Sequence, residues 1–161
     1  MEANNNFQLY ADKGLNIYYN WLMQKTRNNE YYNYELLANM DEYGCYDIMQ
    51  IRHDNEDYSS TSTSYIEIKT REIPFYMYDD CVIDAYKITN LQKLSYHTGN
   101  RCFIAAIYQM DNKIALWEIS AEEQYNTVVK EVNWHTAALQ DGKKNKEMIA
   151  LPLSEAKIYN L

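Results

Sequence analysis

A carboxylate and an amine lie two residues apart in segment 65–71, YIEIKTR. Isoleucines at alternate positions and a β-branched threonine predict a strand here. Because side chains alternate between the two faces of a strand, Glu67 and Lys69 share one face, while Ile66 and Ile68 occupy the other. The segment therefore presents an acid and a base side by side.

An earlier apolar run, residues 46–51, carries Asp47 near its start. If the two runs pair as a hairpin, Asp47 reaches the same end of the sheet as Glu67, and two carboxylates converge with one ammonium. Such a trio suits metal-assisted hydrolysis of a phosphodiester. The carboxylates would hold Mg²⁺ or Mn²⁺, which polarises the phosphoryl group and lowers the pKa of a bound water. Lys69 would orient that water and stabilise the developing charge.

The elements around these residues are predicted from apolar spacing, capping residues and turn residues. The sequence predicts a helix over 9–26, a strand or a helix over 31–37, and strands over 45–52 and up to Arg71. A second helix should begin at Asp79 or Asp80, run to about Tyr96 and end at Gly99. Strands over 101–109 and 113–119 and a short helix that begins at Ser120 should follow.

Asp47 followed by Glu67-Ile68-Lys69, in this order of elements, resembles the PD-(D/E)xK nuclease superfamily, whose members have a restriction-endonuclease-like or resolvase-like fold. The resemblance implies an α/β (α+β) fold with a central mixed sheet of four to five strands flanked by helices, in the order helix-strand-strand-helix-strand-strand. It covers residues 9–119 and leaves 120–161 as a C-terminal elaboration. At this length we expect a single domain, residues 1–161.

The resemblance also implies roles for particular residues. Asp47, Glu67 and the backbone carbonyl of Ile68 would hold Mg²⁺ or Mn²⁺, and Lys69 would position the attacking water. Arg71 and Lys87 would contact phosphates of the nucleic acid, with DNA the expected substrate, duplex or branched. Small stand-alone relatives often act as homodimers, although no segment of this sequence marks an interface.

The sequence offers further candidate ligands for the metal. Asp54 and Asp57 also precede the motif and could reach it from a loop, but a strand holds a ligand more rigidly, which favours Asp47. Many relatives add a glutamate from the first helix, where this chain has only Asn16 and Asn20. Glu35 could substitute only if its segment approaches the site. We therefore expect one metal ion.

Glu-x-Lys is a common pattern, so its setting matters more than its letters. Residues 155–157 repeat it in a predicted helix, and residues 111–113 repeat the aspartate form in a predicted turn. Only the copy at Glu67 lies in a predicted strand that follows another acid-bearing strand. The alternative for Glu67 is a solvent-facing strand with alternating charges.

The formal net charge of −8 is unfavourable for a nuclease, because affinity for nucleic acid depends on Lys and Arg. The acidic excess lies mainly in residues 1–66, which hold ten acids against four bases, whereas residues 67–113 hold six of each. The motif thus lies in the least acidic part of the chain. A second hypothesis follows from the overall charge: a non-catalytic binding or structural protein that keeps this fold, such as a phage component.

Several classes receive no support. The three cysteines are widely spaced and form no zinc pattern, which indicates reduced thiols and a cytoplasmic protein. The Asn-, Tyr- and Lys-rich composition suggests a phage or a low-GC bacterium, hence the host cytoplasm if the gene belongs to a phage. No apolar run is long enough for a membrane span, and the first residues lack the pattern of a signal peptide.

Overall fold

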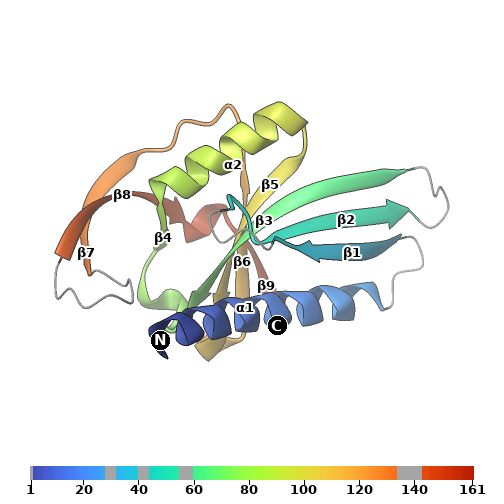
Figure 1. Ribbon diagram of the computed structural model, residues 1–161, viewed down its shortest axis with the longest axis horizontal. Coiled ribbons are helices and arrows are strands. Elements are labelled where there is room, and N and C mark those ends of the chain that lie inside the picture. The colour runs from blue at the N-terminus through green and yellow to red at the C-terminus, as the bar shows by residue number, and fades with distance from the viewer. Residues whose placement is uncertain (1, 28–31, 40–43, 55–59, 134–142) are drawn as a thin grey trace.

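The computed structural model describes residues 2–27, 32–39, 44–54, 60–133 and 143–161. They form a six-stranded mixed sheet, a three-stranded antiparallel sheet and two helices (Figure 1). The helices are α1 (Glu2–Thr26) and α2 (Ala85–Thr98), with short 3-10 turns η1 (Phe75–Met77), η2 (Gln109–Asp111) and η3 (Leu153–Glu155). The strands are β1 (Tyr32–Ala38), β2 (Ile48–Asp54), β3 (Thr61–Arg71), β4 (Asp80–Asp84), β5 (Arg101–Tyr108), β6 (Lys113–Ile119), β7 (Thr127–Asn133), β8 (Lys143–Pro152) and β9 (Lys157–Asn160).

The main sheet has the strand order β1-β2-β3-β5-β6-β9. Only β3 and β5 run parallel, and the chain between them crosses over through β4 and α2. Such a connection is required because a tight turn cannot join parallel strands. The predicted fold class and the order helix-strand-strand-helix-strand-strand are confirmed by α1, β2, β3, α2, β5 and β6. The sheet is wider than expected, since β1 and β9 extend its two edges.

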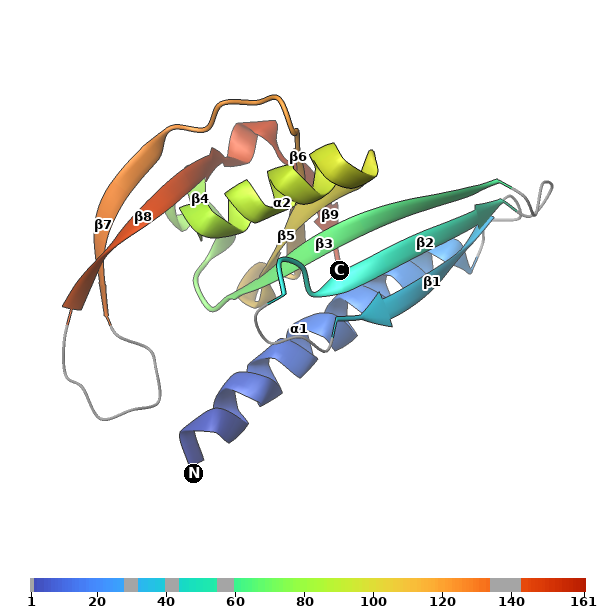
Figure 2. The same cartoon turned by 45° about the horizontal axis from the view of Figure 1, so that its top comes forward.

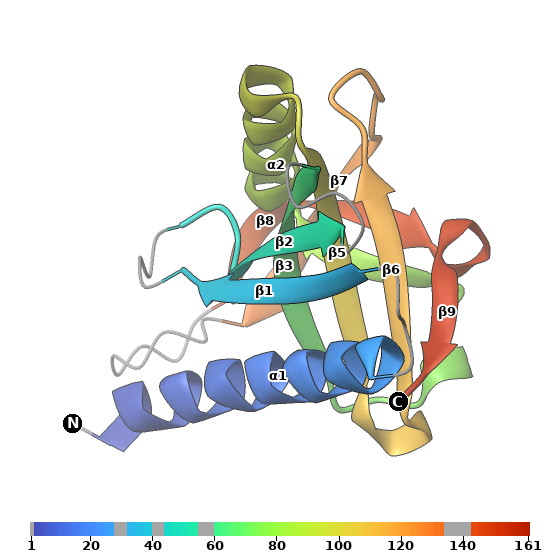
Figure 3. The same cartoon turned by 90° about the vertical axis from the view of Figure 1, so that its right-hand side faces the viewer.

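Each face of the main sheet carries its own apolar core. On one face α1 packs Tyr18 and Trp21 against residues that include Ile66 (Figure 3). On the other face α2 packs Ile88 against Ile104, together with β4 and β8 of the smaller sheet. The central strand β5 is buried on both faces, as its continuous apolar sequence predicts. Residues on β3 therefore point alternately toward α1 and toward α2.

The segment after β3 differs from the prediction. Neither Asp79 nor Asp80 caps a helix, because residues 80–84 form β4, and α2 begins only at Ala85. Burial alternates along β4, and its backbone pairs with β8, which lies far along the chain and which no local pattern revealed. The end of the helix is as predicted: Gly99 adopts φ 68° and its N–H donates to the Ser95 carbonyl.

The C-terminal part also differs from the prediction. Ser120 opens no helix, and residues 155–157 lie in η3 and the start of β9 rather than in a helix. The elaboration is tied to the core, because β9 pairs with β6 and the indole Nε1 of Trp117 donates to the Pro152 carbonyl at 2.8 Å. The ambiguous segment is a strand, β1; Tyr31 lies outside the described residues. Within the described ranges, no helix is long and apolar enough to cross a membrane.

Gly14 lets α1 approach the sheet next to the motif. A Cβ at this position would lie 2.9 Å from Thr70 Oγ1 and 3.2 Å from Ile68 Cγ2. Both neighbours are β-branched and lie on the α1 face of β3, so neither can move aside freely. The glycine therefore sets the distance between the helix and the strand that carries Glu67.

We predict that Gly14→Ala lowers the free energy of unfolding by about 1 kcal/mol. Overpacking against Thr70 costs about 1–3 kcal/mol and exceeds the gain of about 1 kcal/mol from helix propensity. In a Thr70→Ala background the same change should cost nothing or stabilise. Urea unfolding measures both effects, with Asn16→Ala at an exposed position of α1 as the control. If Gly14→Ala stabilises as much as the control, the contact with β3 does not limit this position.

Candidate active site

β3 places Glu67 and Lys69 on the face that carries α2, opposite the face of Ile66. Glu67 is 1% exposed and is the only polar or charged residue among the buried residues of the described ranges. Lys69 remains partly exposed, so the pair lies at the boundary between the core and solvent. A carboxylate so deeply buried requires compensating partners, because desolvation of a charge is costly.

Two lysines supply those partners. Lys69 Nζ lies 2.8 Å from Glu67 Oε1, and Lys87 Nζ, from the first turn of α2, lies 3.1 Å from Glu67 Oε2. Lys87 Nζ also donates to the Gly44 carbonyl at 3.2 Å. Lys87 is thus a counter-ion of Glu67 and a link between α2 and the segment before β2, rather than a free surface lysine.

Asp47 joins the group, although it is not on a strand as the sequence predicted. It occupies a bend immediately before β2. Its N–H donates to the Ile66 carbonyl at 2.9 Å, and its Oδ2 accepts from the Ile68 N–H at 2.6 Å. These two bonds fix Asp47 to β3 directly, so the carboxylate is positioned by hydrogen bonding instead of by a strand of its own.

The carbonyl of Ile68 lies on the β2 side of β3. In a strand, the N–H and C=O of one residue point to the same edge. The Ile68 N–H faces Asp47, so its carbonyl faces the β2 side as well. Pairing of β2 with β3 extends only to Ile48 opposite Ile66, so Ile68 lies beyond the described ladder. Its carbonyl therefore lies on the same side of β3 as its N–H, beyond Ile48, the first residue of β2.

The electrostatics of the site couple these groups. Burial raises the pKa of Asp47, and the Glu67 carboxylate raises it further, while the bond from Ile68 and the two ammonium groups lower it only in part. Burial by itself lowers the pKa of Lys69, but Glu67, with smaller contributions from Asp47 and Asp84, outweighs it and the pKa is raised. Lys69 therefore stays protonated at neutral pH, and the carboxylates repel each other.

The oxygen atoms present fit a hard divalent cation. Asp47 and Glu67 offer carboxylate oxygens and Ile68 a carbonyl, the donor type that Mg²⁺ and Mn²⁺ prefer. Each carboxylate oxygen has two lone pairs, so a bond to lysine still leaves acceptor capacity. Among the described residues, no group of three or more His, Cys, Asp or Glu side chains could hold a metal.

Arg71 is engaged elsewhere. Its Nη2 donates to the Val82 carbonyl and contacts Cys81 Sγ at 3.2 Å. These contacts tie β4 to the end of β3, and a contact of Arg71 with phosphate stays a prediction.

The alternative acids do not join the site either. Asp54 is the last residue of β2 and lies six residues, or about 20 Å, from Ile48, which follows Asp47. Glu35 lies on β1, two strands from β3, and its Oε2 is 3.5 Å from His53 Nε2. Asp57 falls outside the described residues.

Asp84 is a member of this region that the sequence prediction missed. It ends β4, directly before α2, and its Oδ2 lies 2.7 Å from Lys146 Nζ. Its carboxylate contributes to the raised pKa of Lys69. The buried Cys81 and Ile83 alternate with the partly exposed Asp80 and Asp84, and the helix predicted over this segment does not take account of that alternation.

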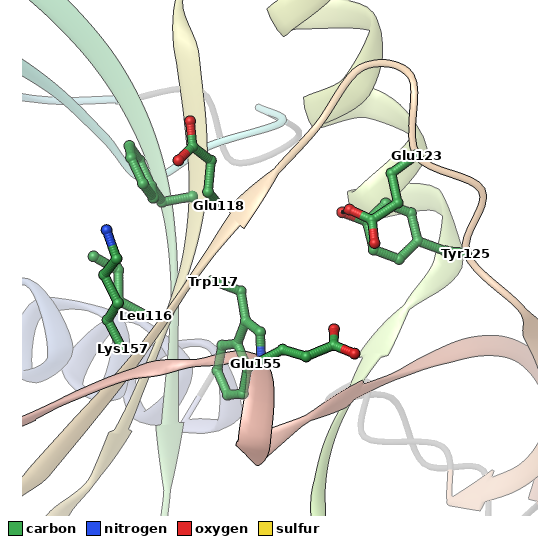
Figure 4. Close-up of a pocket in the computed structure, with 8 residues that line it drawn as sticks. Leu116, Trp117, Glu118, Glu123, Tyr125, Glu155 and Lys157 are labelled. Atoms are coloured by element: carbon green, nitrogen blue, oxygen red, sulfur yellow. Dashed lines mark hydrogen bonds between the residues drawn. The ribbon is translucent and has the colours of Figure 1, made fainter.

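A separate pocket of about 220 Å³ lies at the edge formed by β6 and β9 and contains none of the candidate site residues (Figure 4). Trp117 and Tyr125 contribute rings, and Glu155 and Lys157, the second Glu-x-Lys copy, lie on its rim. Tyr125 donates to Glu123 Oε2 at 2.8 Å. This copy of the pattern has no buried acid and no partner strand bearing Asp.

No protein-family model and no curated protein matches this sequence. Among solved structures, the chain is similar to Hjc, a Holliday junction resolvase from the archaeal hyperthermophile Archaeoglobus fulgidus, with 13% identity. The similarity covers 76% of this chain and 87% of that chain, with a TM-score of 0.38. At that TM-score the likeness carries no inference about residues or activity.

Asp47→Asn should raise the melting temperature at pH 7. A raised pKa in the folded state means that ionised Asp47 costs stability, and this cost appears as the pH rises from its ordinary pKa of 3.8 through the raised value. Asn keeps an oxygen for the Ile68 N–H and carries no charge. The advantage of the variant should shrink as the pH falls and wild type becomes protonated. Thermal melts from pH 4 to 8, with the exposed Asp79→Asn as control, measure it; a difference that does not vary with pH contradicts the assignment.

Lys69→Met should lower the free energy of unfolding by about 3 kcal/mol. Removing one partner of a buried ion pair costs about 3–5 kcal/mol, and Lys87 remains to compensate in part. A double-mutant cycle with Glu67→Gln measures the coupling, which we expect to exceed about 1.5 kcal/mol. Arg101 and Glu118 form an exposed pair whose coupling should stay below about 1 kcal/mol. Equal coupling in the two pairs would show that burial of Glu67 adds nothing.

Proposed function

We propose that this chain is a nuclease that hydrolyses the phosphodiester bonds of DNA with the aid of Mg²⁺ or Mn²⁺. One observation supports the proposal: Asp47 Oδ2 is bonded to the Ile68 N–H at 2.6 Å, and the carboxylate of the adjacent Glu67 lies 2.8 Å from Lys69 Nζ and raises the pKa of Asp47 in addition to burial. Two carboxylates and a carbonyl beside a protonated amine form the set that metal-assisted phosphoryl transfer requires.

Asp47, Glu67 and the Ile68 carbonyl would hold the cation. When bound, the cation polarises the phosphoryl group and makes a water molecule more acidic. Burial raises the pKa of Asp47, and the neighbouring Glu67 carboxylate raises it further. A cation at this point would relieve the repulsion between the two carboxylates. Asp47 can donate one oxygen to the cation while the other keeps its bond to the Ile68 N–H.

Lys69 would orient the attacking water and stabilise negative charge on the phosphoryl oxygens. Its raised pKa keeps the ammonium charged, so it donates hydrogen bonds and does not accept the proton of the water. Its partial exposure leaves it accessible to a phosphate, unlike Glu67.

The second candidate function is a non-catalytic nucleic-acid or protein-binding domain. Its support is the Lys87–Glu67 contact, which neutralises the buried carboxylate from a second side without any metal. In a nuclease Lys87 competes with the cation, so Lys87→Gln should raise metal affinity. In a structural ion triad, Lys87→Gln only lowers stability and no variant binds metal.

Titration calorimetry and cleavage assays test the proposal together. Wild type should bind one Mn²⁺ per chain, and Asp47→Asn should bind it at least about tenfold more weakly because one ligand charge is lost. Single-stranded, duplex and four-way branched DNA serve as substrates. Lys69→Met should reduce cleavage by at least about a hundredfold, since it removes a charge from the reacting centre.

The second Glu-x-Lys copy supplies matched controls. Glu155→Gln and Lys157→Met make the same chemical changes on the rim of the separate pocket, and both should leave metal binding and cleavage unchanged. Circular dichroism of each variant excludes loss of fold as the cause. Wild type that binds neither metal, or that cuts no substrate with either metal, would leave the binding domain as the better proposal.

A further inference from the structure

A groove runs along one side of α2 and contains none of the candidate site residues. Its volume is about 660 Å³, within the range of about 300–1,000 Å³ that is typical of sites for small ligands. Residues of α2 from Ala85 to Lys93 form one wall, and residues 123–127 with Glu147 and Ile149 of β8 form the other. Figures 1 and 2 show the segment before β7 running past α2. The groove is therefore large enough for a planar ring such as a nucleobase.

The second wall of the groove is fixed to the helix. Gln92 Nε2 donates to the carbonyls of Ser120 and Glu123, at 2.9 and 2.7 Å. The Tyr125 hydroxyl in turn donates to Glu123 Oε2 at 2.8 Å. These bonds hold residues 120–125 against α2. Because the two walls are already joined, a ligand that enters the groove pays little for ordering it.

The side chains along the groove favour a neutral ring that carries amino groups. Tyr86 is 55% exposed and offers an aromatic face. No hydrogen bond within the described residues engages the amides of Asn90 and Gln124. Two carboxylates, Glu123 and Glu147, and one lysine are among the described lining residues, so a phosphate is disfavoured here. Carboxylate and amide oxygens instead accept hydrogen bonds from the amino groups of bases.

The groove lies beside the candidate active site. Tyr86 directly precedes Lys87 in the first turn of α2. Lys87 Nζ lies 5.8 Å from the centre of the Tyr86 ring and 3.1 Å from Glu67 Oε2, so one ammonium group borders both the ring and the buried acid. The ammonium groups of Lys69 and Lys87 lie on the side of the acid, whereas the groove is acidic. A nucleotide at this point would have its phosphate toward the lysines and its base toward Tyr86.

We propose that the groove receives one unpaired DNA base with an exocyclic amino group, stacked on Tyr86 beside the bond to be cut. Adenine, cytosine and guanine carry such a group, and thymine does not. A paired base is excluded unless it leaves the stack, which costs free energy. The substrate is then DNA with an unpaired base at the point of cleavage, and not a continuous duplex. The inference rests on the proposed function for its substrate, but its test concerns binding.

The test uses a labelled DNA duplex with one unpaired nucleotide in the middle of one strand. This nucleotide is adenine, thymine or an abasic residue, and binding is measured by fluorescence anisotropy in EDTA and in Ca²⁺. Wild type should bind the adenine duplex at least about tenfold more tightly than the abasic one, because stacking on the ring is lost without the base. Thymine should bind about fivefold more weakly than adenine, since it lacks the amino group. Equal affinity for the adenine duplex and either of the other two would overturn the proposal.

Two variants of Tyr86 and one matched control assign the effect to the groove. Tyr86→Ala should lower the affinity for the adenine duplex to that for the abasic duplex, whereas Tyr86→Phe keeps the ring and should bind as wild type does. Tyr96→Ala removes an exposed tyrosine of the same helix that does not line the groove, and it should leave all three affinities unchanged. Thermal melts check that each variant is folded. An equal loss of affinity in Tyr86→Ala and Tyr96→Ala would also overturn the proposal.

Cleavage assays with Mg²⁺ or Mn²⁺ separate this proposal from the proposed function. Wild type that prefers an unpaired base but cuts no DNA keeps the groove and rejects the nuclease. Cleavage without that preference rejects the groove and keeps the nuclease. Wild type that binds none of the three duplexes in either buffer, and cuts none of them, rejects both.

Discussion

The buried carboxylate of Glu67 is the constraint on which the rest of the site depends. A charge that is 1% exposed must have counter-ions, and they come from two different elements, Lys69 on β3 and Lys87 on α2. The ion triad thus fixes α2 over β3. It also reaches the segment before β2, because Lys87 bonds the Gly44 carbonyl. One buried charge therefore holds together three parts of the chain that are distant in sequence.

The point at which β2 stops pairing with β3 is the second structural requirement. Because the ladder stops at Ile48 opposite Ile66, the N–H and carbonyl of Ile68 are left for other partners. Asp47 Oδ2 accepts the hydrogen bond of the Ile68 N–H, and the Ile68 carbonyl lies on the same side of β3. Had β2 continued by two residues, its backbone would have occupied both groups. The gap in the ladder thus lets the Asp47 carboxylate bind β3 next to Glu67.

The charge distribution shows how an acidic chain can place positive charge at one point. Two ammonium groups, those of Lys69 and Lys87, lie against the buried Glu67 carboxylate. A third, that of Lys146, lies 2.7 Å from Asp84 Oδ2 at the end of β4. Close to the site, local pairing and burial decide the electrostatics, because exposed charges farther than about 10 Å are largely screened in salt.

The sequence by itself determined the strand 65–71, the shared face of Glu67 and Lys69, the order of the core elements and the end of α2 at Gly99, since all of these follow from local periodicity and capping. It also suggested the meeting of Asp47 with Glu67. Only the tertiary structure decided that β4 is a strand, that Arg71 serves β4, that Asp84 belongs to the region and that Lys87 neutralises Glu67. Those features depend on pairing and burial between segments far apart in sequence, and a local pattern contains no information on which distant segment will supply the partner.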